Sequence, residues 1–351
     1  MWFALKKIRC LMIVALPILV FCIAFFAASA VSSVSHKDAS LTETIEVEEV
    51  DCESEKTLYN ILLLGEDGSE RLTDVIMIVS CDTKNGLVNV LQLPRDTYGE
   101  YTSSSYRKIN AASNVLGCES FAEFLSANLR IAIDGYVSLD VDVIAQAVDI
   151  IGGVEIDVPI DMSYEDPYQD LVIEIKKGKQ ILNGEKAKQF VRYREGYVRG
   201  DLGRLDAQKM FVAAFFKKLA QTNNLMTAIQ MISSVLPKTE TNLSLKECIN
   251  IIGKIGVPDA SCIKFMTLPG GDIQGSSGAW YYVMNRESAY KIIKEYFAPE
   301  LSENEFDKER KFTSIVRSGF NEIYDAKSGF DTKIYSAEEI DGGIKIESIY
   351  N

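Results

Sequence analysis

The chain has one histidine in 351 residues, His36, and it precedes the part of the sequence with the patterning of a folded domain. A Ser-His-Asp or Cys-His nucleophile needs a histidine base, and zinc sites commonly use histidine ligands. The patterned region lacks that side chain altogether. Its chemistry must therefore depend on carboxylates, arginines and a hard cation.

Cysteine is also scarce in useful arrangements. The chain has seven cysteines, and the five that follow the N-terminal apolar run are an odd number with irregular spacing. No CxxC pair or Cys/His cluster is present, which argues against a zinc site. We expect mostly free, buried thiols, with one disulfide as the open alternative.

Charge is absent from residues 10–31, which form the longest apolar run of the sequence. As a helix at about 1.5 Å per residue, this run matches the thickness of a bilayer core. The basic residues Lys6, Lys7 and Arg9 precede it and predict a cytoplasmic N-terminus. The alternative is a signal peptide cleaved near Ala28-Ser29-Ala30. We favour a cytoplasmic tail over residues 1–9, a transmembrane helix over 10–32 and an acidic stalk over 33–57, with the remainder outside the cell.

Excess basic charge is missing too, since 37 Lys and Arg face 50 Asp and Glu, a formal net charge of -13. Nucleic-acid-binding proteins present basic patches to the phosphate backbone. An exported, acidic domain is therefore not expected to bind nucleic acid.

Strands and helices alternate over residues 58–298. YNILLLG, TDVIMIVSCD and LVNVLQLP have the length of buried strands, and Lys84-Asn85-Gly86 joins the last two as a hairpin turn. The pattern predicts one α/β domain with a mixed central β-sheet flanked by helices. Residues 299–351 lack a clear period and predict a loosely attached C-terminal tail of unknown role. Helices are expected near residues 120–131, 141–151, 184–191, 205–220, 223–235, 244–253 and 286–297.

Arginines concentrate in two motifs, LPRDT at residues 93–97 and RYREGYVRGDLGR at residues 192–204. Arginine binds phosphate through a planar, bidentate guanidinium. An extended Arg192-Tyr193-Arg194 segment would direct both guanidiniums to one side, and the next helix N-terminus would favour an anion. The motifs predict an anionic phosphate ligand. The alternative is a solvated, salt-bridged surface.

Two carboxylates lie at the ends of the first two strands. Asp67 ends the first strand and Asp74 begins the second. Two carboxylates beside a phosphate suit Mg²⁺, which takes a few oxygen ligands together with phosphate and water. The alternatives are a turn at Asp67 and a strand-end cap at Asp74.

The order of these motifs resembles the LytR–CpsA–Psr family of membrane-anchored cell-wall enzymes. The resemblance covers about residues 58–298 and includes LLGED, TDVIMIVS, LPRDT, KINAA, DIIGGVEIDVP, GKQILNGEKAKQFVRYR and GDLGR. Family members transfer glycopolymers, such as wall teichoic acid or capsule chains, from a polyprenyl pyrophosphate carrier to peptidoglycan, forming a phosphodiester bond. The resemblance implies the same activity here, in a protein held in the cell membrane by a single pass.

The resemblance also implies roles for individual residues. Asp67 and Asp74 match the residues that bind Mg²⁺, for which Mn²⁺ is an alternative, and Arg95, Arg192 and Arg194 match the pyrophosphate-binding arginines. Asp201, Arg204, Gln208, Lys108 and Asn110 match the remainder of the substrate site, whereas Arg199 matches no motif and is expected to be a surface charge.

Two positions depart from the family pattern. Arg71 lies three residues before Asp74 instead of two, and Ala207 replaces the arginine of an Arg-Gln pair. We expect Asp74 to act as general base, although a metal ligand is a poor base. Two other functions stay open: hydrolysis of the polyprenyl pyrophosphate glycan, and a non-catalytic lipid-binding regulator of envelope assembly.

Overall fold

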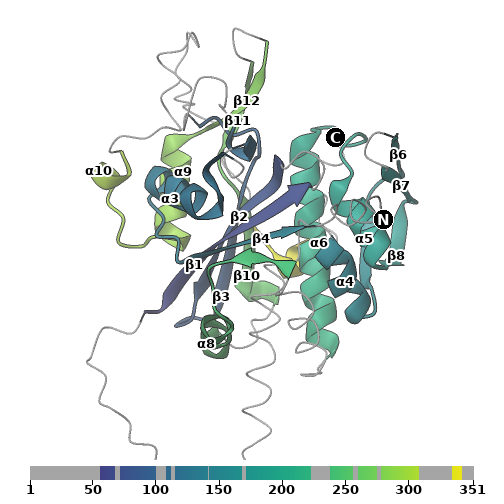
Figure 1. Ribbon diagram of the computed structural model, residues 1–351, viewed down its shortest axis with the longest axis horizontal. Coiled ribbons are helices and arrows are strands. Elements are labelled where there is room, and N and C mark those ends of the chain that lie inside the picture. The colour runs from purple at the N-terminus through teal and green to yellow at the C-terminus, as the bar shows by residue number, and fades with distance from the viewer. Residues whose placement is uncertain are drawn as a thin grey trace, which may run out of the picture.

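A seven-stranded mixed sheet forms the centre of the protein in the computed structural model (Figure 1). The structure describes residues 56–67, 72–99, 108–111, 115–140, 142–167, 171–222, 238–255, 260–274, 278–307 and 334–341. The strand order is β13-β10-β3-β2-β1-β4-β9. The strands are β1 (Leu58–Asp67), β2 (Leu72–Asp82), β3 (Leu87–Leu93), β4 (Gly135–Asp140), β9 (Glu240–Thr241), β10 (Ile263–Thr267) and β13 (Tyr335–Ser336). β1 pairs parallel to β4 and antiparallel to β2, which confirms the predicted mixed sheet.

Three small antiparallel pairs accompany this sheet. They are β5 (Val154–Val158) with β8 (Gly178–Leu182), β6 (Met162–Asp166) with β7 (Leu171–Ile175), and β11 (Gly270–Gln274) with β12 (Trp280–Met284). The helices are α3 (Cys118–Leu129), α4 (Asp142–Ile150), α5 (Gly184–Arg192), α6 (Asp201–Thr222), α8 (Leu245–Ile255), α9 (Arg286–Tyr296), α10 (Glu303–Phe306) and α11 (Ala337–Asp341).

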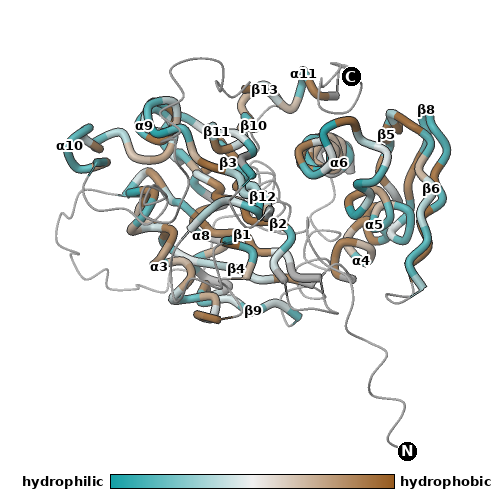
Figure 2. Tube along the Cα trace, turned by 90° about the horizontal axis from the view of Figure 1, so that it is seen from above, coloured by the Kyte–Doolittle hydropathy of each residue, from teal (hydrophilic) through white to brown (hydrophobic). Residues whose placement is uncertain are grey.

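Helices cover both faces of the central sheet, and Figure 2 shows the resulting layers. Alternate residues of β1 separate the two cores, because successive strand side chains point to opposite faces. Ile61 and Leu63 join the core formed with α4, α5 and α6, while Leu62 and Leu64 join the core formed with α3 and α9. The small pairs β5–β8 and β6–β7 lie beyond α4 and α5 (Figure 2).

The predicted β2–β3 hairpin is confirmed. Asp82 pairs with Leu87, and the Asp82 carboxylate accepts the backbone N–H groups of Lys84 and Asn85. Gly86 adopts φ 66°, a left-handed conformation that glycine takes without steric cost.

α6 begins at Asp201, four residues before the predicted start at Leu205. Gly200 has φ 48°, which allows the chain to turn sharply into the helix. Asp201 then lies in the first turn, where a carboxylate is favoured by the helix dipole. Asp201 and Arg204 are therefore one helical turn apart on α6.

Parts of the C-terminal segment pack against the domain. β13 extends the central sheet by pairing with β10, and Phe306 and Ile340 are buried. The prediction of a loosely attached tail is therefore wrong for residues 299–307 and 334–341.

Several predictions fall on residues that the structure does not describe. These are the N-terminal tail, the transmembrane helix, the stalk up to residue 55, His36, and the helix at 223–235. Within the described ranges, no helix is long and apolar enough to span a bilayer. The four described cysteines, Cys81, Cys118, Cys248 and Cys262, are free thiols, as expected for this set.

Gly184 provides a test of the packing between α4 and α5. Its N–H donates to the Asp149 carboxylate at 2.8 Å, and an added Cβ would lie 2.1 Å from the Ala145 carbonyl oxygen. Gly184→Ala should destabilise the protein by about 1–3 kcal/mol, since the two helices must move apart. Thermal unfolding measures the effect, with the exposed neighbour substitution Glu185→Gln as control. Equal unfolding midpoints for both variants would contradict this packing.

Candidate active site

A β-bulge determines where the Asp74 side chain points. Gly65 pairs with Val75 and Glu66 pairs with Thr73, so Asp74 has no partner on β1. A bulge leaves one extra residue on one strand and changes the direction of its side chain. The Asp74 side chain therefore does not follow the alternation of side chains that places Val75 in one core and Ile76 in the other.

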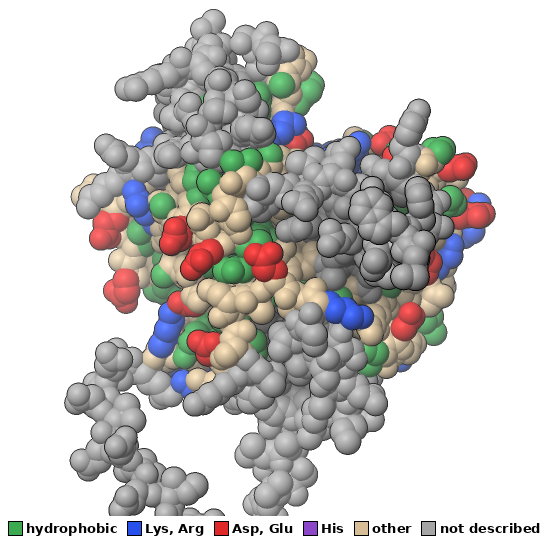
Figure 3. All heavy atoms as spheres, in the orientation of Figure 1, with side chains coloured by type: hydrophobic (Ala, Val, Ile, Leu, Met, Phe, Trp, Pro, Cys, Tyr) green, Lys and Arg blue, Asp and Glu red, His purple; other side chains and the backbone are tan. Residues whose placement is uncertain are grey.

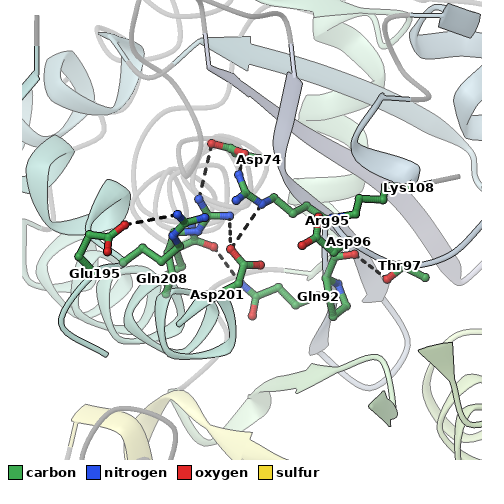
Figure 4. Close-up of polar contacts among 12 residues, drawn as sticks. Asp74, Gln92, Arg95, Asp96, Thr97, Lys108, Glu195, Asp201 and Gln208 are labelled. Atoms are coloured by element: carbon green, nitrogen blue, oxygen red, sulfur yellow. Dashed lines mark hydrogen bonds and ion pairs between the residues drawn. The ribbon is translucent and has the colours of Figure 1, made fainter. Parts of the chain in front are cut away.

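Asp74 is held by two arginines from different parts of the chain (Figure 4). Arg95 Nη1 donates to Asp74 Oδ1, and Arg204 Nη1 lies 3.6 Å from Asp74 Oδ2. Asp201 Oδ1 lies 2.7 Å from Arg204 Nη2 and 3.5 Å from Arg95 Nε. The two carboxylates and two guanidiniums form one network, in which the Arg204 side chain is only 6% exposed.

The network perturbs the titration of its members. Burial alone raises the pKa of Asp74, but the charges of Arg204 and Arg95 outweigh burial and lower that pKa below its usual value. The charge of Arg192 acts in the same direction. Because the pKa of Asp74 is lower in the folded protein, the ion pairs contribute their full stability at any pH above the ordinary pKa of an aspartate. This contribution is lost as the pH falls through the lowered pKa.

Local contacts fix Arg95 at the end of β3. Pro94 follows the strand, and the Thr97 N–H donates to the Pro94 carbonyl at 2.9 Å. The Asn110 N–H donates to the Arg95 carbonyl at 3.1 Å, and Lys108 forms an ion pair with Asp96 at 2.9 Å. Lys108 and Asn110 thus lie beside the LPRDT loop, where the structure shows them supporting it.

Arg192 and Arg194 do not share one extended segment, contrary to the prediction. Arg192 is the last residue of α5, and the N–H of Tyr193 still donates to the Gln189 carbonyl. The chain leaves the helix at Tyr193, which has φ -64° and ψ 136°. Arg192 is half-buried and its charge reaches Asp74, whereas Arg194 is exposed and lies 3.4 Å from Glu195. Among the described contacts, the charge of Arg192 acts on Asp74, whereas Arg194 pairs with Glu195 and not with the Asp74 network.

Gln208 lies behind the arginines and is 1% exposed. Its amide accepts from Gln92 Nε2 at 3.1 Å and donates to the Val191 carbonyl at 3.2 Å. These bonds connect α6 to β3 and to the residue before Arg192. Gln208 is placed to align the three segments that carry Arg95, Arg192 and Arg204.

Lys209 is a buried charge that the sequence did not single out. It is 3% exposed, and its Nζ lies 2.7 Å from both Asp206 Oδ1 and Thr267 Oγ1. The contact with Thr267 fixes α6 to the end of β10. The sequence did contain a signal for this ion pair, because Lys209 follows Asp206 by three residues on a predicted helix.

The β11–β12 hairpin is attached to the LPRDT loop. The Tyr282 N–H donates to the Asp96 carbonyl at 2.9 Å, and the Tyr98 N–H donates to the Tyr282 carbonyl at 2.8 Å. Asp272 pairs with Tyr282 across the hairpin. Arg199, predicted to be a plain surface charge, is exposed, but its charge reaches Asp272.

The predicted metal ligands lie on neighbouring strands. Asp67 ends β1 and pairs with Leu72, two residues before Asp74. The Asp67 side chain lies beyond what the structure describes, and in the described part no three acidic, histidine or cysteine side chains form a metal cluster.

Comparisons with known proteins agree with this architecture. A teichoic acid transferase of Bacillus subtilis (strain 168), named polyisoprenyl-teichoic acid–peptidoglycan teichoic acid transferase TagV, is 29% identical over 262 residues, covering 70% of this chain and 67% of TagV. The transferase TagU of Bacillus mycoides (strain KBAB4) is 25% identical over 253 residues, covering 70% of this chain and 78% of TagU. The crystal structure of B. subtilis TagV is similar with a TM-score of 0.58 and 28% identity, covering 68% of this chain and 97% of that chain.

The family assignment rests on the extent of the match. The sequence model of the LytR_cpsA_psr family matches residues 23–297, most of the 351 residues and all of the site described above. This match confirms the resemblance seen in the order of the motifs. The chain belongs to the LytR_cpsA_psr family.

Proposed function

We propose that this protein transfers an anionic glycopolymer from a polyprenyl pyrophosphate carrier to peptidoglycan, forming a phosphodiester bond. The observation that carries this proposal is the convergence of Arg95, Arg192 and Arg204 on Asp74 from three separate segments. The related TagV and TagU are named polyisoprenyl-teichoic acid–peptidoglycan teichoic acid transferases.

The arrangement of charge supports a phosphate ligand. The guanidiniums of Arg95, Arg192 and Arg204 lie around the carboxylates of Asp74 and Asp201, and the first turn of α6 adds the positive end of a helix dipole. Acidic and basic side chains are both scattered over the face that Figure 3 presents, and the whole chain has a formal net charge of -13. These converging guanidinium donors are suited to one anionic group.

The arginines would act by position and charge. Phosphoryl transfer needs little covalent chemistry from the protein, so pre-aligned donors can stabilise the charge that develops on the phosphate oxygens and the leaving group. Arg95 and Arg204 are held by Asp74 and Asp201 before substrate arrives. A diphosphate would compete with these carboxylates for the same guanidinium N–H groups.

Asp67 and Asp74 would hold Mg²⁺, or Mn²⁺, at the diphosphate. The metal would supply additional positive charge at the phosphate oxygens. Asp74 is a poor general base in this arrangement, because the nearby guanidiniums stabilise its ionised form. Its role is to bind charge, and the proton of the acceptor needs another group.

We also place the protein in the cell membrane, anchored by residues 10–32, with the N-terminus in the cytoplasm and the domain outside. The uncharged run and its preceding basic residues support this placement. Such an anchor would keep the site near a lipid-linked donor.

The decisive assay supplies purified full-length protein in detergent with a polyprenyl pyrophosphate-linked glycopolymer and peptidoglycan. We expect the labelled polymer to become covalently attached to the peptidoglycan. Release of free polymer without attachment would favour the hydrolase alternative instead.

Arg192→Lys tests the role of the guanidinium. The substitution keeps the charge but loses the planar, bidentate donor, so the transfer rate should fall about a hundredfold or more. Arg286→Lys, which alters an exposed arginine paired with Asp307, is the matched control and should retain the normal rate. Equal rates for the two variants would remove Arg192 from the site.

Metal removal tests the two aspartates. Chelation with EDTA should abolish transfer, and added Mg²⁺ should restore it, since the metal offsets charge at the diphosphate. Asp67→Asn should raise the Mg²⁺ concentration needed for half-maximal rate about tenfold or more. Undiminished transfer in EDTA would exclude a metal role.

A further inference from the structure

The acidic side chains around the site differ in how they are paired. Asp74 and Asp201 are held by arginines, and Asp96 is held by Lys108. Asp272, on β11, has no hydrogen bond or ion pair within the described ranges. A carboxylate that accepts a proton during transfer is best placed when no cation already holds its oxygens. Of these four side chains, only Asp272 meets this condition among the described residues.

Hydrogen bonds place Asp272 next to the phosphate site. It pairs with Tyr282 on β12, whose N–H donates to the Asp96 carbonyl of the LPRDT loop. The charged groups that face Asp272 come from this loop and from the start of α6 and the residues before it. They are Asp96, Asp201 and Arg199, together with the phenol of Tyr282.

These neighbours favour proton uptake by Asp272. Asp272 is exposed, yet desolvation by the groups beside it raises the pKa of its carboxyl. The charge of Arg199 lowers that pKa and the charges of Asp96 and Asp201 raise it, with a net increase above the usual value. The shift is opposite in direction to that of Asp74. A base whose pKa is closer to neutral accepts a proton more effectively.

The same face of the hairpin carries an exposed aromatic ring. Residues directly opposite one another in an antiparallel pair share a face, and so do residues two apart in a strand. Asp272, Tyr282 and Trp280 therefore lie on one face, and Trp280 is 56% exposed. Diagonal neighbours in such a pair are about 7–8 Å apart, a span that one pyranose ring can bridge.

We propose that the β11–β12 hairpin is the acceptor subsite, in which Trp280 stacks against a sugar ring of the acceptor and Asp272 accepts the proton of its attacking hydroxyl. This inference rests on the proposed transferase function. The ligand of this subsite is a glycan strand, because an aromatic ring offers an apolar surface against which the C–H face of a sugar can pack.

The transfer step balances without a further reactant. The acceptor oxygen forms a bond to the phosphorus next to the glycopolymer, and the bond from that phosphorus to the bridging oxygen breaks. The electron pair of the broken bond leaves with polyprenyl phosphate. The hydroxyl proton passes to the Asp272 carboxylate and then to water.

Asp272→Asn tests the proton acceptor in full-length protein, with the lipid-linked donor and soluble peptidoglycan glycan strands. We expect kcat to fall about a hundredfold or more with unchanged KM for the donor, because general base catalysis contributes that much. The wild-type rate should fall as the pH drops through the raised pKa of Asp272, since the protonated carboxyl cannot accept a proton. Asp272→Asn should lose this fall in rate at low pH. Asp272→Glu should recover part of the rate together with its fall at low pH.

Trp280→Ala tests the stacking surface. We expect the KM for the glycan strand to rise about tenfold with little change in kcat, and Trp280→Phe to recover part of the affinity. Glu287→Gln and Val172→Ala are controls at exposed positions on α9 and β7 and should match wild type. Unfolding midpoints verify that all variants are folded.

The outcomes separate this inference from the proposed function. If the wild type transfers polymer but Asp272→Asn keeps its kcat and pH profile, or Trp280→Ala keeps its acceptor KM, the acceptor subsite is overturned and the transferase stands. If the wild type neither binds glycan strands nor transfers polymer to them, both are overturned.

Discussion

The shared Asp74 carboxylate is the interaction on which the site depends. It lies between Arg95, which follows β3, and Arg204, which lies on α6, and so it links the central sheet to the helix that covers it. Like-charged guanidiniums held this close would repel one another without a carboxylate between them. Desolvation offsets part of the attraction in a buried pair of this kind. The value of this pair is geometric, since it aligns donors before a ligand binds.

The framework behind this network consists of neutral contacts. Gln208 connects β3, α5 and α6 through the oxygen and the nitrogen of its side-chain amide, and the close approach of Gly184 to Ala145 places α5 against α4. These contacts are buried, so small displacements are costly. The arginines are therefore carried by packed elements, whereas Arg194 and Lys108 lie nearer the rim and pair with exposed or half-exposed partners.

The sequence predicted only part of the central sheet: β1, β2 and β3 were expected, whereas β4, β9, β10 and β13 were not. Apolar runs and the Lys84-Asn85-Gly86 turn follow local rules, and these strands formed where expected. The bulge that redirects Asp74 depends on the pairing of β1 with β2, which no local pattern encodes. The start of α6 at Asp201 was detectable, because glycine followed by a first-turn aspartate is a helix-start signal. Asp272 was not detectable, since its importance arises from a hairpin that reaches the LPRDT loop across about 175 residues of chain.

The site separates two tasks that one carboxylate could not perform. A residue that stabilises arginines and a metal must stay ionised, and the positive charges around Asp74 lower its pKa accordingly. A residue that accepts a proton needs a less stable ionised form. Desolvation, with a smaller contribution from the Asp96 and Asp201 charges, raises the pKa of Asp272 in this way. Opposite shifts in a pair of carboxyl groups commonly mark a division between electrostatic and proton-transfer roles. In a domain without a useful histidine, this division is the available route to a base at the acceptor hydroxyl.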